Sequence, residues 1–241
     1  MRLDLYLVEM GLAESRARAQ AAIAAGLVRV NEKPALKAST KIAAGDEVCV
    51  AGAAHPFVSR GGVKLDAALR TFEIDPAGKI CLDLGASTGG FSDVLLRADA
   101  AKLYAVDVGR GQLHEKILND ARVINLEQTH AKELSPALIP DLIDIIVCDV
   151  SFISLKKALP FAMALAAPGA ALAALIKPQF EVGRVGLGKG GIVKEGLAAP
   201  VILDIERWLG ATGWYVKGVI DSPITGGDGN KEFLIGATKT A

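Results

Sequence analysis

The sequence predicts an α/β protein in which a doubly wound, mostly parallel sheet is preceded by a small α+β unit. Apolar runs of the buried-strand type alternate with helical patterns from about residue 60 to the end of the chain. A glycine-rich turn, residues 85–90, joins the first of these strands to the helix that follows it. The first fifty residues hold two short helical patterns and a few short strands instead.

The N-terminal segment is expected to form two helices and a few strands. Leu3, Leu7 and Met10 are spaced as one face of a first helix. Ser15 suits the N-cap of a second helix, whose inward face is expected to consist of Ala17, Ala21 and Ala24. The strands "LVRVN" and "EVCV" follow, and residues 51–60, "AGAAHPFVSR", are predicted to be a linker.

Strands and helices alternate through the larger unit. Four apolar runs predict its buried parallel strands: "KICLDLG", "KLYAVDVG", "LIDIIVCDVSF" and "ALAALIK". The uncharged stretch 161–176 is interpreted as a helix, a turn at Pro168-Gly169 and a strand, because it is short for a membrane span. The last strands, "WYVKGVI" and "EFLIGAT", are expected to pair as an antiparallel hairpin at one side of the sheet.

The composition is that of a globular protein with a sizeable core, 51% hydrophobic and 22% charged. The formal net charge is zero, but residues 1–64 carry nine Lys and Arg against six Asp and Glu, which indicates a polyanionic partner for this segment. Cys49, Cys81 and Cys148 form no C-x-x-C pair, so no metal is expected. The three thiols lie in apolar, strand-like runs and are expected to be buried and free, as in a reducing compartment. Together with the lack of a signal sequence, they predict a cytoplasmic protein with no membrane segment. No oligomeric state is predicted.

The stretch 83–90, "DLGASTGG", fits three motifs. Its Gly85-x-Ser87-x-Gly89 pattern matches the nucleophile elbow of hydrolases, which needs a catalytic histidine after the later strands. The histidines that follow, His114 and His130, come before most of the sheet, which argues against a hydrolase. A dinucleotide-binding turn would need glycine at Ser87 and would place the carboxylate of Asp83 beside phosphates that it repels.

S-adenosylmethionine fits this stretch better, because it carries an α-ammonium group and no phosphate. Asp83 suits the ammonium group, and the N-terminus of the following helix can receive the carboxylate. Asp107 lies 20 residues beyond Ser87, where an acid binds ribose hydroxyls in such folds. The alternative is a purely structural β–α turn with a capping Asp. The expected cofactor-binding residues are Asp83, Gly85, Ser87, Gly89, Gly90, Phe91, Asp107, Val108 and Asp149.

A second glycine-rich stretch, "GRVGLGKG" at 183–190, resembles a phosphate-binding P-loop. Gly190 stands where a P-loop needs Ser or Thr to bind Mg²⁺, and Gly190-Gly191 is a poor start for a helix. The stretch is therefore interpreted as a mobile loop near the site.

Four polar residues lie at the ends of apolar elements. Lys64 precedes a helix, Asp149 and Lys177 end two strands, and Glu232 begins the last strand. An antiparallel strand starts at the rim where parallel strands end, so the last three can converge, although each alone is more simply a strand end in water. Two lysines and two carboxylates suit methyl transfer to a ribose hydroxyl without a metal. A lysine can orient the hydroxyl or take its proton, while the carboxylates position the lysines.

Together these motifs resemble the TlyA family, bacterial proteins often labelled haemolysin A that are similar to FtsJ-type RNA ribose 2′-O-methyltransferases. The resemblance covers essentially the full length and rests on "SRGGVKL", "LDLGASTGGFSDVLL", "YAVDVG", "CDVSFISL", "KPQFEVGR", "GKGGIV" and "GNKEFL". It implies a Rossmann-like, S-adenosylmethionine-dependent methyltransferase domain at 59–241. It also implies a K-D-K-E catalytic tetrad consisting of Lys64, Asp149, Lys177 and Glu232.

The same resemblance implies that residues 1–58 form a small RNA-binding domain, similar to one in a ribosomal small-subunit protein. Its implied substrate is ribosomal RNA with cytidine targets. The expected RNA contacts, mostly to phosphates, are Arg2, Arg16, Arg18, Lys33, Lys37, Lys41 and Arg60. Taken singly, each of these charges also fits a solvated surface.

One stretch departs from the family pattern: "LEQTHAKEL" (126–134) has His130 and Lys132 where the family has Asn and Arg. Two rival functions stay open beside the methyltransferase. One is a non-catalytic RNA- or ribosome-binding factor that keeps the fold. The other is a membrane-active haemolysin, which needs an amphipathic or spanning segment that the sequence does not indicate.

Overall fold

The computed structural model describes the chain except for residues 11, 14, 44, 51–56, 227–228 and 241. The chain divides into two compact units, Met1–Arg60 and Gly61–Ala241. Six residues of the predicted linker, 51–56, lie outside the described residues. The expected domain limits, 1–58 and 59–241, stay a prediction about which parts fold independently.

The N-terminal unit packs two helices on a small antiparallel sheet with the strand order β2-β1-β3. Its elements are α1 (Leu3–Glu9), α2 (Arg16–Ala24), β1 (Val28–Val30), β2 (Lys33–Pro34) and β3 (Val48–Val50). Ser15 is the N-cap of α2, because its hydroxyl accepts a hydrogen bond from the backbone N–H of Arg18 at 3.3 Å. Cys49 on β3 and Met10 after α1 are both exposed, so the predictions that placed them in the core were wrong.

The inward face of α2 differs from the predicted one. Ala19 and Ile23 are buried, whereas Ala17, Ala21 and Ala24 are exposed. In a helix made largely of alanine the apolar stripe is poorly marked, and the large side chain of Ile23 gains most from burial. The prediction from the alanines was therefore wrong.

The C-terminal unit is built on a seven-stranded sheet with the order β6-β5-β4-β7-β8-β10-β9. β10 is antiparallel to both of its neighbours, and the other paired strands run parallel, as the sequence predicted. The strands are β4 (Ile80–Leu84), β5 (Lys102–Val106), β6 (Val123–Leu126), β7 (Ile143–Cys148), β8 (Ala166–Ile176), β9 (Trp214–Asp221) and β10 (Phe233–Lys239).

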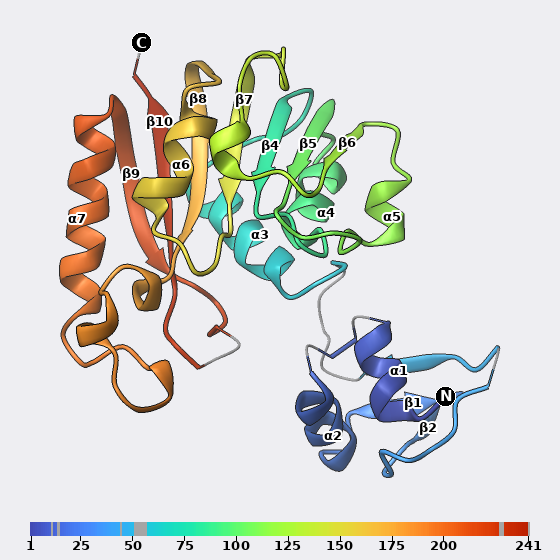
Figure 1. Cartoon of the computed structure of the whole chain (residues 1–241). Coiled ribbons are helices and arrows are strands. Elements are labelled where there is room, and N and C mark those ends of the chain that lie inside the picture. Colours follow the sequence, from blue (N-terminus) through green and yellow to red (C-terminus); the bar gives the residue numbers. More distant parts are fainter. Residues whose placement is uncertain (11, 14, 44, 51–56, 227–228, 241) are drawn as a thin grey trace. The chain divides into compact units, whose positions relative to one another are not determined.

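Helices cover both faces of this sheet, which makes it doubly wound. Leu172, Ala174 and Ile176 of β8 belong to the core shared with α6 and α7, which lie on the near face in Figure 1. The alternating Ala173 and Leu175 are also buried and face the other way, where α3 packs on β8 and β10. The helices are α3 (Gly61–Thr71), α4 (Gly90–Arg97), α5 (Glu115–Leu118), α6 (Leu155–Met163) and α7 (Ala198–Ala211).

β8 is longer than the sequence predicted, because it already begins at Ala166 and includes Pro168-Gly169. Ile143 lies opposite Ala166 and Ile145 lies opposite Ala171, so the extra residues form a bulge in which Gly169 has a φ of +75°. The bulge accommodates a proline that cannot donate to a ladder. In the described part of the chain, no helix combines the length and the apolar character that a membrane span requires.

The packing of α3 on β10 predicts a specific sensitivity. A Cβ atom at Gly236 would lie 2.3 Å from the ring of Phe72, so Gly236→Ala should destabilise the fold by about 1–3 kcal/mol. Gly210 is the matched control: it lies inside α7 with nothing within 4 Å of its Cβ position, and Gly210→Ala should stabilise by about 0.5–1 kcal/mol. Urea unfolding measures both, and equal midpoints for Gly236→Ala and the wild type would contradict this packing.

Candidate active site

Three of the four predicted catalytic residues lie at one rim of the sheet. Asp149 follows β7 directly, and Lys177 follows β8 directly. Glu232 precedes β10, in which Phe233 lies opposite Ile176, so the same register sets Glu232 opposite Lys177. The reversed direction of β10 therefore brings its first end to the place where the parallel strands finish.

The tetrad forms two ion pairs. Lys64 Nζ lies 2.6 Å from Glu232 Oε2, and Lys177 Nζ lies 2.6 Å from Asp149 Oδ1. Lys177 also donates a hydrogen bond to the hydroxyl of Ser151 at 2.8 Å. Lys64 lies within the first turns of α3 rather than before the helix, and both lysine side chains are only 11% exposed.

The glycine-rich turn lies against the Lys177–Asp149 pair. Gly85 has a φ of +87°, and a Cβ atom there would be 2.6 Å from the carbonyl oxygen of Asp149. The backbone N–H of Asp149 in turn donates to the carbonyl of Leu84 at 3.0 Å. A residue other than glycine at position 85 would therefore displace Asp149.

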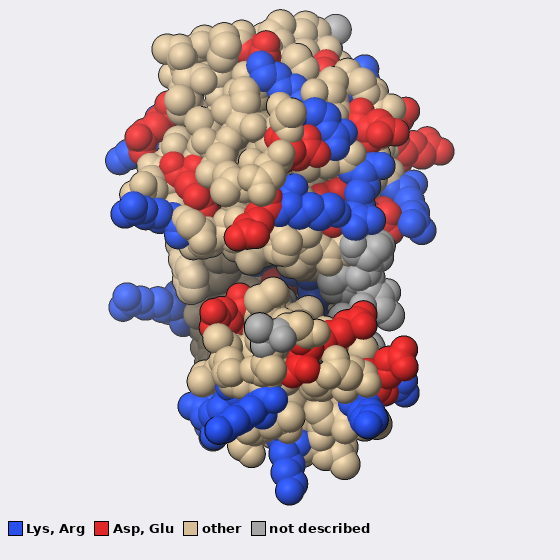
Figure 2. All heavy atoms as spheres, turned by 90° about the vertical axis from the view of Figure 1, so that its right-hand side faces the viewer, with Lys and Arg blue, Asp and Glu red and all other residues tan. Residues whose placement is uncertain are grey.

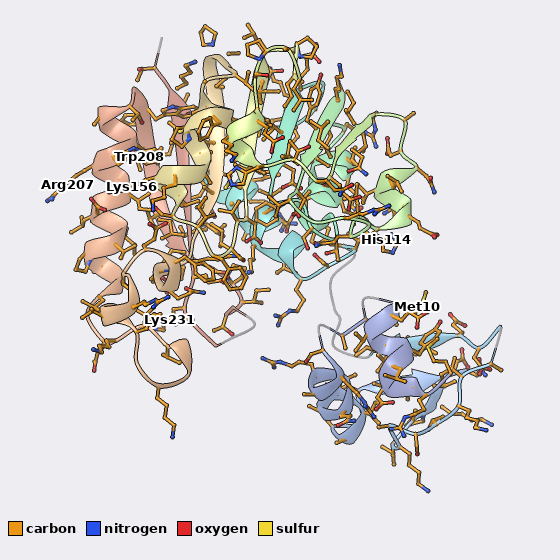
Figure 3. All side chains as sticks on the ribbon, in the orientation of Figure 1. Met10, His114, Lys156, Arg207, Trp208 and Lys231 are labelled. Atoms are coloured by element: carbon orange, nitrogen blue, oxygen red, sulfur yellow. The ribbon has the colours of Figure 1, made fainter. Side chains whose placement is uncertain are left out.

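Asp107 fastens the turn from its other side. Its carboxylate accepts hydrogen bonds from the backbone N–H of Ser87 at 2.9 Å and of Gly109 at 2.7 Å. The hydroxyl of Ser87 lies 3.2 Å from the side-chain oxygen of Gln112. His114, labelled in Figure 3, uses Nδ1 to cap α5. In these contacts Ser87 is a residue of the turn. Among the described residues, no base contacts its hydroxyl and could activate it as a nucleophile.

Asp83 is fully buried in β4. The Ser92 hydroxyl donates to its Oδ2 at 2.6 Å, and among the described residues Oδ1 has no hydrogen-bond partner. Burial raises the pKa of Asp83 to about 7, and the negative charges of Asp149 and Asp107 add to the rise. A buried, incompletely bonded carboxylate near two other acids suits a cationic ligand group, so the site fits the ammonium group of S-adenosylmethionine.

The remaining predicted cofactor residues occupy different surroundings. Gly89 has a φ of +89°, and Leu113 and Ile117 pack 3.0 Å from its Cβ position, so glycine is required for this close approach. Gly90 begins α4, Phe91 is buried within α4, and Val108 beyond β5 is 69% exposed. The roles of Phe91 and Val108 in binding a cofactor stay predictions.

Two of the predicted RNA contacts are engaged with an acid of the same unit. Arg2 Nε and Arg16 Nε lie 2.9 Å and 2.8 Å from the carboxylate of Asp4, to which Gln20 also donates. These hydrogen bonds, those of Arg2 and Arg16 first, hold the pKa of Asp4 well below its usual range. The arginine side chains stay 44% and 56% exposed, so Asp4 orients them while leaving part of each guanidinium group accessible.

The other predicted RNA contacts are surface cations. Arg18, Lys33, Lys37 and Lys41 are exposed, and Arg60 is half-buried. Arg29 on β1 is also exposed and was missed by the sequence analysis. In Figure 2, Lys and Arg side chains stand out from the N-terminal unit at several places, which suits contacts to phosphates.

Phe152 is a candidate that sequence reasoning missed. Its side chain is 90% exposed and its φ is +64°, although it lies three residues after Asp149. Its ring stays close to that of Phe180, with 5.0 Å between the centroids. An exposed aromatic ring on a left-handed residue, three residues after a predicted catalytic acid, is a strained feature typical of a binding site. The signal was its place in "CDVSF", directly after the polar end of a strand.

The departing stretch 126–134 has a local structural role. His130 accepts a hydrogen bond from the Lys132 N–H through Nδ1, and Glu133 accepts one from the His130 N–H, which completes a capping box. Glu127 accepts hydrogen bonds from the backbone N–H groups of Gln112 and Leu113, which holds that loop beside the glycine-rich turn.

Comparison with known proteins matches both units to families. Residues 57–239 match the FtsJ-like methyltransferase family, and residues 1–48 match the S4 domain. The 16S/23S rRNA (cytidine-2'-O)-methyltransferase TlyA of Mycobacterium tuberculosis is 44% identical over 97% of this chain and 88% of that protein. Hemolysin A of Brachyspira hyodysenteriae is 42% identical over 97% of this chain and 98% of its own length.

Solved structures agree with these matches. A protein of Streptococcus thermophilus, described as a hemolysin, superposes with a TM-score of 0.85 at 40% identity and covers 100% of this chain and 88% of its own. The O-methyltransferase TomG of Streptomyces achromogenes is 18% identical, with a TM-score of 0.52 over 76% of this chain and 81% of its own. That second likeness shows the methyltransferase fold alone.

The burial of Asp83 predicts that Asp83→Asn gains stability over the wild type as the pH rises. In the folded protein Asp83 stays protonated up to about pH 7, whereas its ordinary pKa is 3.8. The wild type therefore loses stability as the pH rises from about 4 to 7. Asparagine keeps the bond from Ser92 without ionising. Asp83→Asn should therefore become more stable than the wild type by about 1 kcal/mol per pH unit between pH 4 and 7.

Thermal unfolding at several pH values measures this difference. Asp221→Asn, a change to an exposed acid at the end of β9, serves as the matched control and should follow the wild type at every pH. A gain for Asp83→Asn that did not change with pH would show that ionisation of Asp83 is not its cause.

Proposed function

The chain belongs to the FtsJ-like methyltransferase family, and we propose that it transfers a methyl group from S-adenosylmethionine to a ribose 2′-hydroxyl of ribosomal RNA. The observation that carries the proposal is the Lys177–Asp149 pair, which lies against the glycine-rich turn that comes directly after the strand of the buried Asp83. Cytidine is the proposed target nucleoside, because the relative from M. tuberculosis carries that name. Ribosomal subunits would be met in the cytoplasm.

The fold and the family imply use of S-adenosylmethionine, and the chain offers groups for each part of it. Asp83 would bind the ammonium group. The Asp107 carboxylate accepts from the N–H groups of Ser87 and Gly109, and its remaining lone pairs would accept hydrogen bonds from the ribose hydroxyls. The acids at this end of the sheet also favour a positively charged sulfur over a neutral one. When bound, the cofactor supplies an electrophilic methyl group on that sulfur and leaves as a neutral thioether.

Lys177 and Asp149 are the proposed groups at the reacting hydroxyl. Lys177 Nζ pairs with Asp149 and donates to Ser151, and its remaining N–H can donate a hydrogen bond to the 2′-oxygen. As the oxygen–methyl bond forms, the hydroxyl proton leaves through this lysine–carboxylate pair to solvent. Holding the oxygen in line with the methyl group contributes the larger part of the rate. The proposal includes no metal ion.

Lys64 and Glu232 form the more enclosed pair, with the Glu232 side chain only 4% exposed. They are proposed to flank the ribose opposite Lys177, because Glu232 faces Lys177 across the β8–β10 register. The N-terminal S4 domain would bind the RNA backbone through its exposed cations. The exposed ring of Phe152 would stack on a nucleobase near the target.

Removal of Lys177 tests the chemistry. Lys177→Ala should lower methyl transfer from labelled S-adenosylmethionine to ribosomal subunits by about 100-fold or more, because it removes the group that binds the reacting oxygen. The affinity for S-adenosylhomocysteine should change little. Lys156→Ala is the matched control and should leave methyl transfer unchanged. Lys156 of α6 pairs with Asp204 of α7, and it is labelled in Figure 3.

Transfer that survived in Lys177→Ala would overturn the mechanism. No transfer by the wild type to either subunit would favour the non-catalytic RNA-binding factor instead. Mapping of ribose methylation by its resistance to alkaline cleavage then identifies the modified nucleotide.

The raised pKa of Asp83 predicts how cofactor binding depends on pH. An ammonium group beside Asp83 favours the carboxylate, so binding must release the proton that the free protein holds below about pH 7. Affinity for S-adenosylhomocysteine should therefore fall by up to about tenfold per pH unit below 7. Calorimetry in two buffers of different ionisation enthalpy measures the released proton. If Asp83→Asn released as many protons on binding as the wild type, the released proton would come from a group other than Asp83.

A further inference from the structure

The glycine-rich loop, residues 183–194, is closed on itself by its own hydrogen bonds. The Gly188 N–H donates to the carbonyl of Ile192 at 2.7 Å, and the Lys194 N–H donates to that of Gly186 at 3.0 Å. Leu187 and Val193 form an isolated antiparallel bridge between these two bonds. These bonds lie within the loop and do not involve the side chain of Asn230.

Asn230 joins this loop to the chain that leads into β10. Its side chain is buried, with the residue only 2% exposed. Oδ1 accepts a hydrogen bond from the Val193 N–H at 2.9 Å, and Nδ2 donates to the Gly191 carbonyl at 3.1 Å. One amide thus satisfies a donor and an acceptor of the loop, and it stands two residues before Glu232.

The loop and the residue after Asn230 carry positive charge. Arg184, Lys189 and Lys194 are exposed, and so is Lys231, which stands between Asn230 and Glu232 and is labelled in Figure 3. Of the described acids nearby, Glu181 accepts a hydrogen bond from the Leu155 N–H, and Glu195 and Asp221 are exposed. Four cations against two exposed acids, joined through Asn230 to the chain that leads into β10, suit the phosphates on either side of a target nucleotide.

We propose that Asn230 is a positioning residue that holds the basic loop 183–194 in register with Glu232, so that the loop grips the phosphates flanking the nucleotide to be methylated. The inference rests on the proposed function, since it takes RNA as the substrate. Asn230 itself touches neither reacting atom. It acts by tying the loop's cations to the strand that carries the Lys64–Glu232 pair.

A positioning role and a merely structural role for Asn230 predict different outcomes. The loop's internal bonds do not involve Asn230, so a positioning role predicts that truncation leaves a folded protein whose loop charges no longer act together with the site. A structural role predicts that truncation lowers thermal stability and cofactor affinity together. Coupling between two changes is the direct measure of such a role, because independent sites contribute additively.

The experiment is a double-mutant cycle on RNA affinity. Asn230→Ala, the double variant Arg184→Ala with Lys189→Ala, and all three changes together are titrated against purified bacterial ribosomal subunits with saturating S-adenosylhomocysteine. The double variant and Asn230→Ala should each weaken binding by about tenfold and flatten its salt dependence. The triple variant should be weaker than Asn230→Ala by only about twofold, because the charges are already out of register.

Two controls keep the cycle specific. Lys156→Ala with Arg207→Ala removes two charges from α6 and α7, and Asn119→Ala truncates an exposed asparagine at the end of α5. Both variants should bind subunits as the wild type does. Affinity of Asn230→Ala for S-adenosylhomocysteine should stay within about twofold of the wild type, because the cofactor turn is untouched. If Asn230→Ala does not fold, Asn230→Asp replaces it, since the carboxylate still accepts from Val193 but repels the Gly191 carbonyl.

A triple variant that loses affinity by the product of the separate effects, about a hundredfold, would overturn the proposal, as would unchanged binding by Asn230→Ala. Joint loss of cofactor affinity and thermal stability would assign Asn230 a structural role and would overturn it too. Methyl transfer by the wild type is measured in parallel. If transfer is absent while the affinity cycle shows coupling, the proposed reaction fails and the inference about Asn230 stands.

Discussion

Among the described strands of the large sheet, β10 alone runs opposite to the others, and its direction decides where Glu232 lies. Parallel strands end at a common rim, so a parallel β10 would have carried Glu232 to the opposite edge. The reversal lets Glu232 meet Lys64, which stands 168 residues away on α3. Removing one member of so enclosed a pair leaves an unpaired buried charge, at a cost of about 3–5 kcal/mol. Lys64 and Glu232 therefore hold α3 on the sheet as well as lining the site.

The sequence was sufficient to predict the features that depend on strand direction. Asp149 and Lys177 are polar residues that end apolar runs, and the rule that such ends converge predicted their meeting. Lys64 was expected before a helix and lies inside one, because no cap residue marked the start of α3. Phe152 and Asn230 escaped notice, since their significance lies in a backbone angle and in hydrogen bonds to residues 37 and 39 positions away. The prediction of the buried face of α2 was wrong because the alanine-rich helix has no clear apolar stripe.

The cations expected to bind RNA fall into two physical groups. Arg2 and Arg16 share the buried carboxylate of Asp4, which limits their side-chain freedom before any ligand arrives. A preorganised guanidinium group loses less entropy on binding a phosphate than a freely rotating lysine does. The exposed lysines of the same unit add charge without fixed geometry. The two arginines thus offer a fixed geometry for a phosphate, and the exposed lysines add attraction to it. Amino-acid composition alone cannot show this difference.

The close approach of Gly85 to Asp149 has a consequence for how this protein can vary. The proposed cofactor turn and the proposed reaction centre share a contact in which a Cβ atom at Gly85 would lie 2.6 Å from the carbonyl oxygen of Asp149. A substitution that altered the turn to suit another cofactor would shift Asp149, and with it Lys177, before any new ligand was gained. In the proposed site, a change of methyl donor would therefore also disturb the residues proposed to act on the acceptor.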